Sequence, residues 1–164
     1  MIFVTVGTHE QPFTRLVEYM DKWAASHDEE VVIQVGYSEY EPKHCTWQRF
    51  YHQYEMDKFN ASGRIVVTHG GPSCYMEVIR LGKIPVVVPR RHEFGEHVDN
   101  HQLDISRRYS KLYNSILLVE QMDQLGEYLD NYDDCITDKT RYGLPANNAK
   151  FCDEFSKIID KLLS

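Results

Sequence analysis

The sequence has no long apolar run, no excess of basic residues and no leader-like start. No run of about 18 apolar residues occurs, so we expect no membrane-spanning segment. Asp and Glu total 25 against 18 Lys and Arg, which gives a formal net charge of −7 and a pI of about 5.6 and disfavours a nucleic-acid partner. The first residues have the apolar pattern of a strand, so no signal peptide is expected. We expect a cytoplasmic chain that only a partner could hold at a membrane.

Known signatures of metal and cofactor sites are also missing. The four cysteines include no C-x-x-C pair, and neither H-E-x-x-H nor D-x-D occurs. The eight histidines are scattered apart from His92, His97 and His101, so we expect neither a metal site nor a cofactor. The chain also lacks G-x-G-x-x-G and a P-loop, which disfavours a dinucleotide and a kinase-type triphosphate.

What the sequence does contain is an alternation of strand-like and helix-like segments. Its 164 residues, 42% apolar and 26% charged, fit one globular domain over residues 1–164. Apolar runs predict strands at 2–6, 31–35, 64–68, 84–88 and 116–119. Helical periodicity predicts helices at 12–20, 50–59, 72–81, 97–110, 121–130 and 147–163. This alternation predicts an α/β fold, a Rossmann-like parallel sheet with helices on both faces.

Polar and glycine-rich segments follow three of the predicted strands. In such sheets ligands bind beyond the carboxyl ends of the strands. These positions hold Gly7-Thr8-His9, then His69-Gly70-Gly71-Pro72-Ser73, and then Arg90-Arg91. Paired glycines let backbone approach a ligand, and the N–H groups of a helix that Pro72 opens favour a phosphate or diphosphate. The alternative is a tight turn that needs glycine for its own geometry.

Side chains near these segments suit other parts of a ligand. Glu77 lies one helical turn beyond Ser73, where a carboxylate can accept the hydrogens of ribose hydroxyls. Arginines after the fourth strand can bind phosphate in bidentate fashion, and their place at the ligand edge favours this over the alternative, a solvated turn. The run at 99–102, DNHQ, suits a sugar ring, and helix capping is its alternative.

Three segments together resemble one known family. They are VTVGTHE at 4–10, HGGPSCYME at 69–77 and VPRRHEFGEHVDNHQ at 88–102. Their order and spacing resemble the glycosyltransferase family 28 C-terminal domain, the donor-binding half of a two-domain GT-B enzyme, over about residues 1–160. The resemblance is strongest to soluble subunits of bacterial capsular and exopolysaccharide β-1,4-galactosyltransferases and glucuronosyltransferases. It is more distant to the soluble subunit of the eukaryotic transferase that adds GlcNAc to a dolichol-linked sugar.

This resemblance implies roles for individual residues. Glu77 would hold the ribose, the loop at 7–9 with Ser73 and Cys74 the diphosphate, His101 and Gln102 the sugar, and backbone near Gln53 the uracil. Cys74 stands where the family sometimes has Thr or Ser. The predicted substrate-binding set is Gly7, Thr8, His9, Gln53, His69, Gly70, Gly71, Ser73, Cys74, Glu77, Arg90, Arg91, Asn100, His101 and Gln102. The catalytic base is left unassigned, with His9 and Glu96 as first candidates, Glu93 and His97 nearby, and a partner residue as the alternative.

The resemblance also implies a split enzyme. This chain would bind a UDP-sugar, with UDP-galactose expected first, UDP-glucuronate second and UDP-GlcNAc third. A membrane-anchored second subunit would bring a lipid-linked saccharide acceptor, and the transfer would invert the anomeric centre at the inner face of the membrane. Two alternatives stay open: a non-catalytic nucleotide-sugar-binding activator of that subunit, and a UDP-sugar epimerase on the same half-fold.

The predicted last helix carries an apolar stripe that needs a surface to cover it. The stripe comprises Phe151, Phe155, Ile158, Ile159, Leu162 and Leu163. Docking onto the chain's own sheet is the favoured expectation. The membrane subunit and a homodimer are the other two.

Overall fold

The computed structural model describes residues 1–141 and 147–163 and contains one parallel sheet of six strands. The strands are β1 (Ile2–Thr5), β2 (Val31–Gln34), β3 (Thr46–Gln48), β4 (Ile65–His69), β5 (Val86–Val88) and β6 (Leu117–Leu118). They lie in the order β3-β2-β1-β4-β5-β6, with every neighbouring pair parallel. This is the strand order of the Rossmann fold, and it confirms the predicted fold class.

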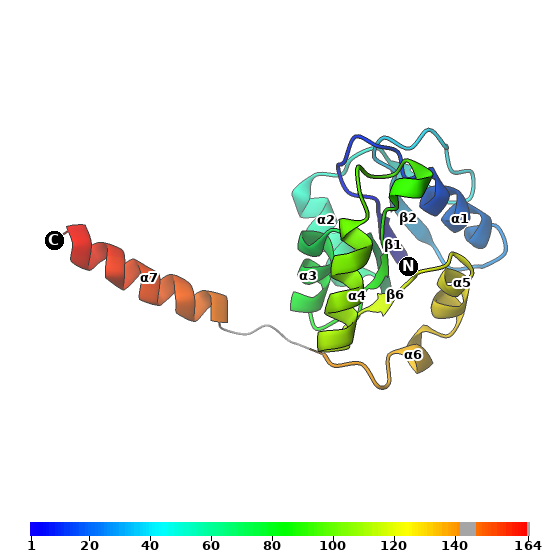
Figure 1. Ribbon diagram of the computed structural model, residues 1–164. Coiled ribbons are helices and arrows are strands. Elements are labelled where there is room, and N and C mark those ends of the chain that lie inside the picture. The colour runs from blue at the N-terminus through cyan, green and yellow to red at the C-terminus, as the bar shows by residue number, and fades with distance from the viewer. Residues whose placement is uncertain (142–146, 164) are drawn as a thin grey trace.

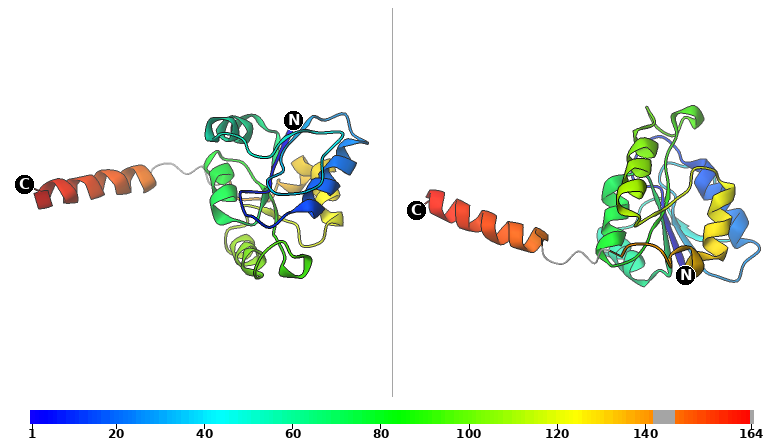
Figure 2. Two further views of the ribbon diagram at one scale, coloured as in Figure 1. Left: turned by 90° about the horizontal axis from the view of Figure 1, so that it is seen from above. Right: turned by 60° about the horizontal axis from the view of Figure 1, so that its bottom comes forward.

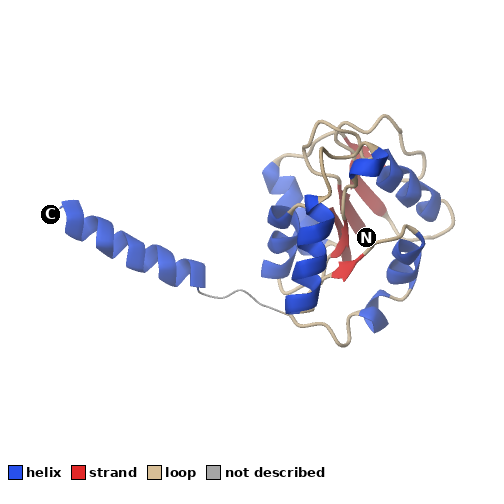
Figure 3. Ribbon diagram, in the orientation of Figure 1, coloured by secondary structure: helices blue, strands red, loops and turns tan. Residues whose placement is uncertain are grey.

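Helices cover both faces of this sheet (Figures 1 and 3). The covering helices are α1 (Thr14–Ala24), α2 (Gln53–Ser62), α3 (Pro72–Arg80), α4 (His101–Tyr113), α5 (Asp123–Asp130) and α6 (Tyr132–Cys135), and α7 (Asn147–Leu163) follows them. A short 3-10 helix, η1 (His92–Phe94), precedes α4. Apolar side chains of α1, α5 and α6 pack on one face, and those of α2, α3 and α4 pack on the other.

Alternation along each strand explains the two apolar layers. In β1, Ile2 and Val4 join the core under α1 and α5, whereas Phe3 points the opposite way and stacks on Phe59 of α2 at 5.0 Å. Successive side chains of a strand point to opposite faces, so a strand that is apolar at every position must be buried on both. The uninterrupted apolar runs of the sequence meet this requirement.

Besides η1, two short elements were not predicted, and several boundaries differ. Neither β3 nor α6 has a clear periodic signal in the sequence. The edge strand β3 pairs with β2 and is exposed at two of its three residues, and α6 is a single helical turn. Pro12 does not open α1, because the N–H of Phe13 instead donates to Ser38 Oγ at 3.1 Å and the helix begins at Thr14. The helix predicted from residue 97 begins at His101, whose N–H donates to Asp99 Oδ1 at 3.1 Å.

A buried arginine joins the loops at the carboxyl edge of the sheet. Arg90 follows β5 and is 0% exposed. Its guanidinium donates to the carbonyls of Gln11 at 2.6 Å, Glu96 at 3.0 Å and Val6 at 2.8 Å. Burial lowers the pKa of Arg90 to about 10, which still leaves the group charged at neutral pH. Arg90 therefore holds the β1 and β5 loops together from inside.

Glu96 completes this arrangement. Its carboxylate, only 3% exposed, accepts two hydrogen bonds from Arg15 of α1, at 2.8 and 2.9 Å, and one from the N–H of Arg91 at 3.0 Å. The paired geometry is the bidentate form that arginine makes with carboxylates. The β5 loop is thus tied both to the loop after β1 and to the helix that follows it.

The last helix does not lie on the sheet. All described side chains of α7, residues 152–163, are exposed, and the helix projects away from the other elements in each view (Figures 1 and 2). The expectation that this helix docks on its own sheet is therefore wrong, because α1 to α6 already cover both faces. The Phe151 side chain lies outside the described part of the chain. Among the described helices, none has the length and apolar character to cross a membrane.

Replacing Arg90 should destabilise the fold. Arg90→Met keeps an unbranched side chain but leaves three carbonyls without their donor, so the free energy of unfolding should fall by about 3 kcal/mol or more. Urea denaturation of both proteins measures this difference. The control Arg108→Met changes an exposed arginine of α4 and should stay within about 0.5 kcal/mol of the wild type. Equal losses in the two variants would contradict the role given to Arg90.

Candidate functional site

A cleft of about 550 Å³ opens where the sheet changes its direction of winding. The chain leaves β1 toward β2 and leaves β4 toward β5, so the neighbouring strands β1 and β4 form the switch point at which such sheets bind ligands. The cleft lies at the carboxyl ends of β1, β2 and β4. Its lining is Thr5, Gly7, Thr8, His9, Glu10, Gln34, Tyr51, Gln53, Met56, His69, Ser73, Cys74 and Glu77.

The last residue of β2 organises one wall of the cleft. Gln34 Nε2 donates to Thr5 Oγ1 at 3.2 Å, and Gln34 Oε1 accepts the N–H of Tyr51 at 3.1 Å. Thr5 Oγ1 also accepts the N–H of Gly7 at 3.2 Å. One buried amide therefore positions the loop after β1 against the segment that leads into α2.

The histidine that ends β4 explains why glycines flank it. A Cβ on Gly7, which has φ of +77°, would lie 2.4 Å from His69 Nε2, and one on Gly71 would lie 2.2 Å from His69 Cε1. A Cβ on Gly70 would press on Pro89 and Gln102, at 3.0 Å from each. Gly70 and Gly71 therefore also make room for the His69 ring and the β5 loop, whereas neither is among the residues that line the cleft.

His69 is neutral at neutral pH. Burial lowers its pKa to about 4, and the nearby Arg90 charge acts in the same direction. The N–H of Gly71 donates to Nδ1 at 3.0 Å, so the ring carries its proton on Nε2, which faces Cys74 Sγ at 3.1 Å. Burial also raises the pKa of Cys74, so this sulfur is a thiol and a poor nucleophile.

Helix α3 points its first turn at the cleft. Gly71 is its N-cap and Pro72 its first residue, so the positive end of the helix dipole lies beside Ser73 and Cys74. Glu77, one turn later, is exposed and lines the same cleft. Helix α3 therefore presents an N-terminus that can bind an anion and, one turn later, a carboxylate that can accept hydrogen bonds.

Both predicted arginines lie outside this lining. Arg90 cannot contact a phosphate, because its terminal nitrogens are used by buried carbonyls. Arg91 Nε donates to Glu93 Oε1 at 3.1 Å. Glu96, a candidate base, is buried and paired with Arg15, so it has no open position to accept a proton from a substrate. His9 remains the candidate base in the cleft, with Nε2 placed 2.9 Å from Gln11 Oε1.

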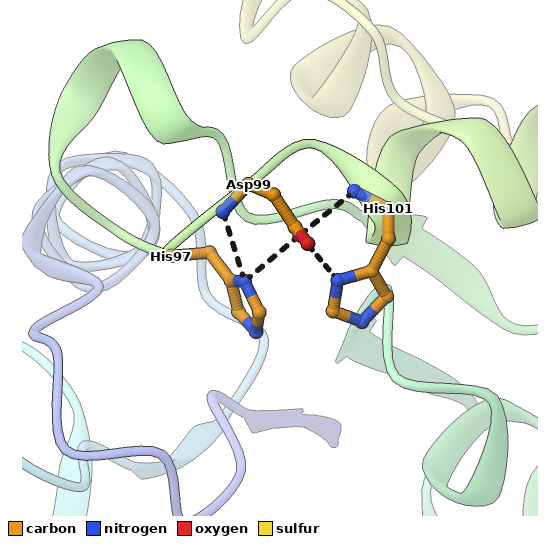
Figure 4. Close-up of side chains that lie close together, drawn as sticks. All are labelled: His97, Asp99 and His101. Atoms are coloured by element: carbon orange, nitrogen blue, oxygen red, sulfur yellow. Dashed lines mark hydrogen bonds and ion pairs between the residues drawn. The ribbon is translucent and has the colours of Figure 1, made fainter.

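The residues expected to contact a sugar lie at the start of α4. Gln102 is buried and its Oε1 accepts the N–H of Arg90 at 3.2 Å. Asn100 Oδ1 accepts the N–H of His92 at 2.9 Å, which is a loop-stabilising contact. His101 is exposed and contacts Asp99, next to His97 (Figure 4). None of these residues is among those that line the cleft.

Eight of the predicted binding residues therefore gather in one place, and several lining residues were not predicted. The gathered residues are Gly7, Thr8, His9, Gln53, His69, Ser73, Cys74 and Glu77. The unpredicted ones include Thr5 and Gln34, each a polar residue that ends an otherwise apolar strand. That signal was available, because a polar side chain at the carboxyl end of a buried strand points to the ligand edge.

Comparisons with known proteins agree with this architecture. The sequence matches the glycosyltransferase family 28 C-terminal domain over residues 1–161. A search of curated proteins finds no match. Among solved structures, the glycotransferase of kitacinnamycin is 16% identical with a TM-score of 0.56, and the similarity covers 84% of this chain and 35% of that chain. CalG4, the calicheamicin glycosyltransferase, is 15% identical with a TM-score of 0.58, and the shares are 99% and 44%.

At these identities the structural similarity shows the fold alone, and this chain spans less than half the length of either protein. The family match covers nearly every residue, including the strands and loops that build the cleft. The chain therefore belongs to the glycosyltransferase family 28 C-terminal domain family.

Proposed function

We propose that this chain binds the UDP-sugar donor of an inverting hexosyltransferase, as one subunit of a split GT-B enzyme. The observation that carries the proposal is the arrangement of α3 at the switch point: an open helix N-terminus and Glu77 one turn beyond it, both in one cleft. The N-terminus suits a diphosphate, and Glu77 suits the two ribose hydroxyls. Gln53 and Tyr51, from the segment that enters α2, would face the uracil ring.

The chemistry follows from charge development. An acceptor hydroxyl attacks the anomeric carbon of the sugar, the bond to the diphosphate oxygen breaks, and UDP leaves with an added negative charge. The N-terminal turn of α3 is already oriented toward this charge, so it stabilises the leaving group without reorganising. The hydroxyl proton must pass to a base. His9 is the candidate on this chain, and a residue of the second subunit is the alternative.

The donor sugar is proposed by order of resemblance, with UDP-galactose first, UDP-glucuronate second and UDP-GlcNAc third. A uronate carboxylate would need a cationic partner in the cleft, and the lining residues include no Lys or Arg. This charge pattern favours a neutral hexose over UDP-glucuronate.

A second subunit is proposed from the family resemblance and from α7. The resemblance is to one half of a GT-B enzyme, which closes its cleft between two Rossmann-like halves. The exposed apolar stripe of α7, with Ile158 55% and Leu162 75% exposed, suits burial against such a subunit. That subunit would be anchored in the membrane and would bring a lipid-linked saccharide to the inner membrane face.

Binding of UDP tests the donor site. Calorimetric titration of UDP into the purified chain should show one site, and Glu77→Ala should weaken binding by about 10- to 100-fold, because it removes hydrogen bonds to a charged acceptor. Glu127→Ala, an exposed glutamate of α5 on the other face of the sheet, is the matched control and should bind as the wild type does. Equal UDP affinity in both variants would overturn the role of Glu77.

Product analysis separates the proposal from its alternatives. With the membrane subunit and acceptor present, transfer consumes the UDP-sugar and releases UDP. An epimerase releases an altered UDP-sugar without any acceptor. A non-catalytic activator would leave polymer synthesis intact in Glu77→Ala.

Changes in α7 test the partner surface. The double substitution Ile158→Asp and Leu162→Asp should leave UDP affinity unchanged and abolish transfer in the presence of membranes that hold the second subunit. Asp160→Ala, on the opposite side of α7, should retain transfer. Size-exclusion chromatography with light scattering shows whether the stripe instead forms a homodimer. Full transfer by the double variant would show that α7 is not the joining surface.

A further inference from the structure

Three potential metal ligands lie together beside the cleft. His97 and Asp99 come from the turn after η1, and His101 is the first residue of α4. One ligand atom from each lies within 4.8 Å of the other two, and the three side chains point toward one another (Figure 4). None of the three is among the residues that line the cleft, so they form a separate cluster, here called the His-Asp-His cluster.

The spacing within the cluster is close to that of a metal site. Two ligand atoms about 2.0–2.1 Å from a tetrahedral ion are about 3.4 Å apart. His97 Nδ1 and Asp99 Oδ1 are 3.3 Å apart. The Nδ1 atom of His101 hydrogen-bonds to the same Asp99 oxygen, and His97 Nδ1 accepts the N–H of Asp99 at 3.5 Å, so an ion would enter by replacing the shared proton and displacing this long hydrogen bond.

The surrounding structure already holds the ligands in place. The ring of His97 is buried and stacks on His9 with centroids 4.6 Å apart. The carbonyl of His97 lies 3.2 Å from His92 Nδ1, and the N–H of His101 donates to Asp99 Oδ1 at 3.1 Å. The backbone of the turn and the ring of His97 are therefore already held in position, so less conformational freedom is lost when an ion binds.

We propose that His97, Asp99 and His101 bind one divalent transition-metal ion of the zinc type. Two imidazoles and one carboxylate suit Zn²⁺, Co²⁺ or Ni²⁺, whereas Mg²⁺ and Ca²⁺ prefer sites made only of oxygen. Three protein ligands leave a fourth position for water or for an oxygen of a bound molecule.

The bound ion also has a consequence for the cleft, and this consequence rests on the proposed function. The residues that line the cleft include Glu10 and Glu77 but no Lys or Arg, although the proposed ligand carries a diphosphate. His9 lines the cleft and stacks directly on His97, so the ion lies one ring away from the lining. Its charge therefore favours an anion in the cleft and strengthens UDP binding.

Titration with Zn²⁺, and with Co²⁺ as a spectroscopic probe, tests the site. The purified chain should bind one ion, and Co²⁺ should give the visible absorption of a low-coordinate site. Asp99→Asn and His101→Gln should each weaken binding at least about tenfold. Both side chains are largely exposed, 58% and 46%, so these variants should stay folded, as circular dichroism will verify.

His27→Gln is the matched control, because it removes a partly exposed histidine that packs on Trp23, in a different part of the structure. It should bind Zn²⁺ as the wild type does, and Mg²⁺ should not compete. No binding by the wild type, or equal binding by the wild type and both cluster variants, would overturn the proposal.

A second titration separates this proposal from the proposed function. Zn²⁺ should increase UDP affinity in the wild type but not in Asp99→Asn, which also corrects for complexes of Zn²⁺ with free UDP. Zinc binding without any gain in UDP affinity would overturn the role of the ion in the cleft. Zinc binding by a chain that binds no UDP under any condition would overturn the donor site and leave the metal site in place. Glu77→Ala should lose UDP and keep Zn²⁺.

Discussion

A single buried guanidinium holds together the edge of the sheet where the cleft lies. Arg90 spans from the end of β5 to carbonyls of the β1 loop and of its own loop, and Glu96 links this assembly to α1 through Arg15. A charge placed inside a protein needs hydrogen-bond partners, and the two terminal nitrogens of Arg90 find them in carbonyls of these loops, so the loops can take few other positions while Arg90 is present. The positions of His9 in the cleft and of His97 in the adjoining cluster both depend on these loops.

The site itself combines rigid backbone with little charge. His69 occupies the space between Gly7 and Gly71, stays neutral through burial, and so shapes the floor of the cleft without adding a cation. The positive end of α3 is the main favourable field for a diphosphate among the lining elements. In our proposals, an ion in the His-Asp-His cluster would add the charge that the lining lacks, and Glu77 would bind the ribose.

Much of this arrangement could be predicted from local patterns. Three features depend only on residues close in sequence: the apolar pattern of the strands, the glycine turn before α3, and the spacing of Ser73 and Glu77 on that helix. Of the binding residues predicted from such features and from the resemblance, eight lie in one cleft. The inward position of Arg90 was not predicted. The sequence around a polar residue just after a strand is the same in two cases: the side chain can point outward to a ligand, or inward to carbonyls of a loop about 80 residues away.

The sequence by itself determined the parallel α/β architecture, because apolar periodicity sets which faces are buried. It also determined the family, because three motifs keep their order and spacing. Only the tertiary structure decided that Arg90 is a loop anchor, that α7 stands apart from a sheet already covered on both faces, and that His97, Asp99 and His101 converge. Each of these three features depends on which segments lie next to one another in the folded chain. The local periodicity of apolar residues carries no information on the distances between loops.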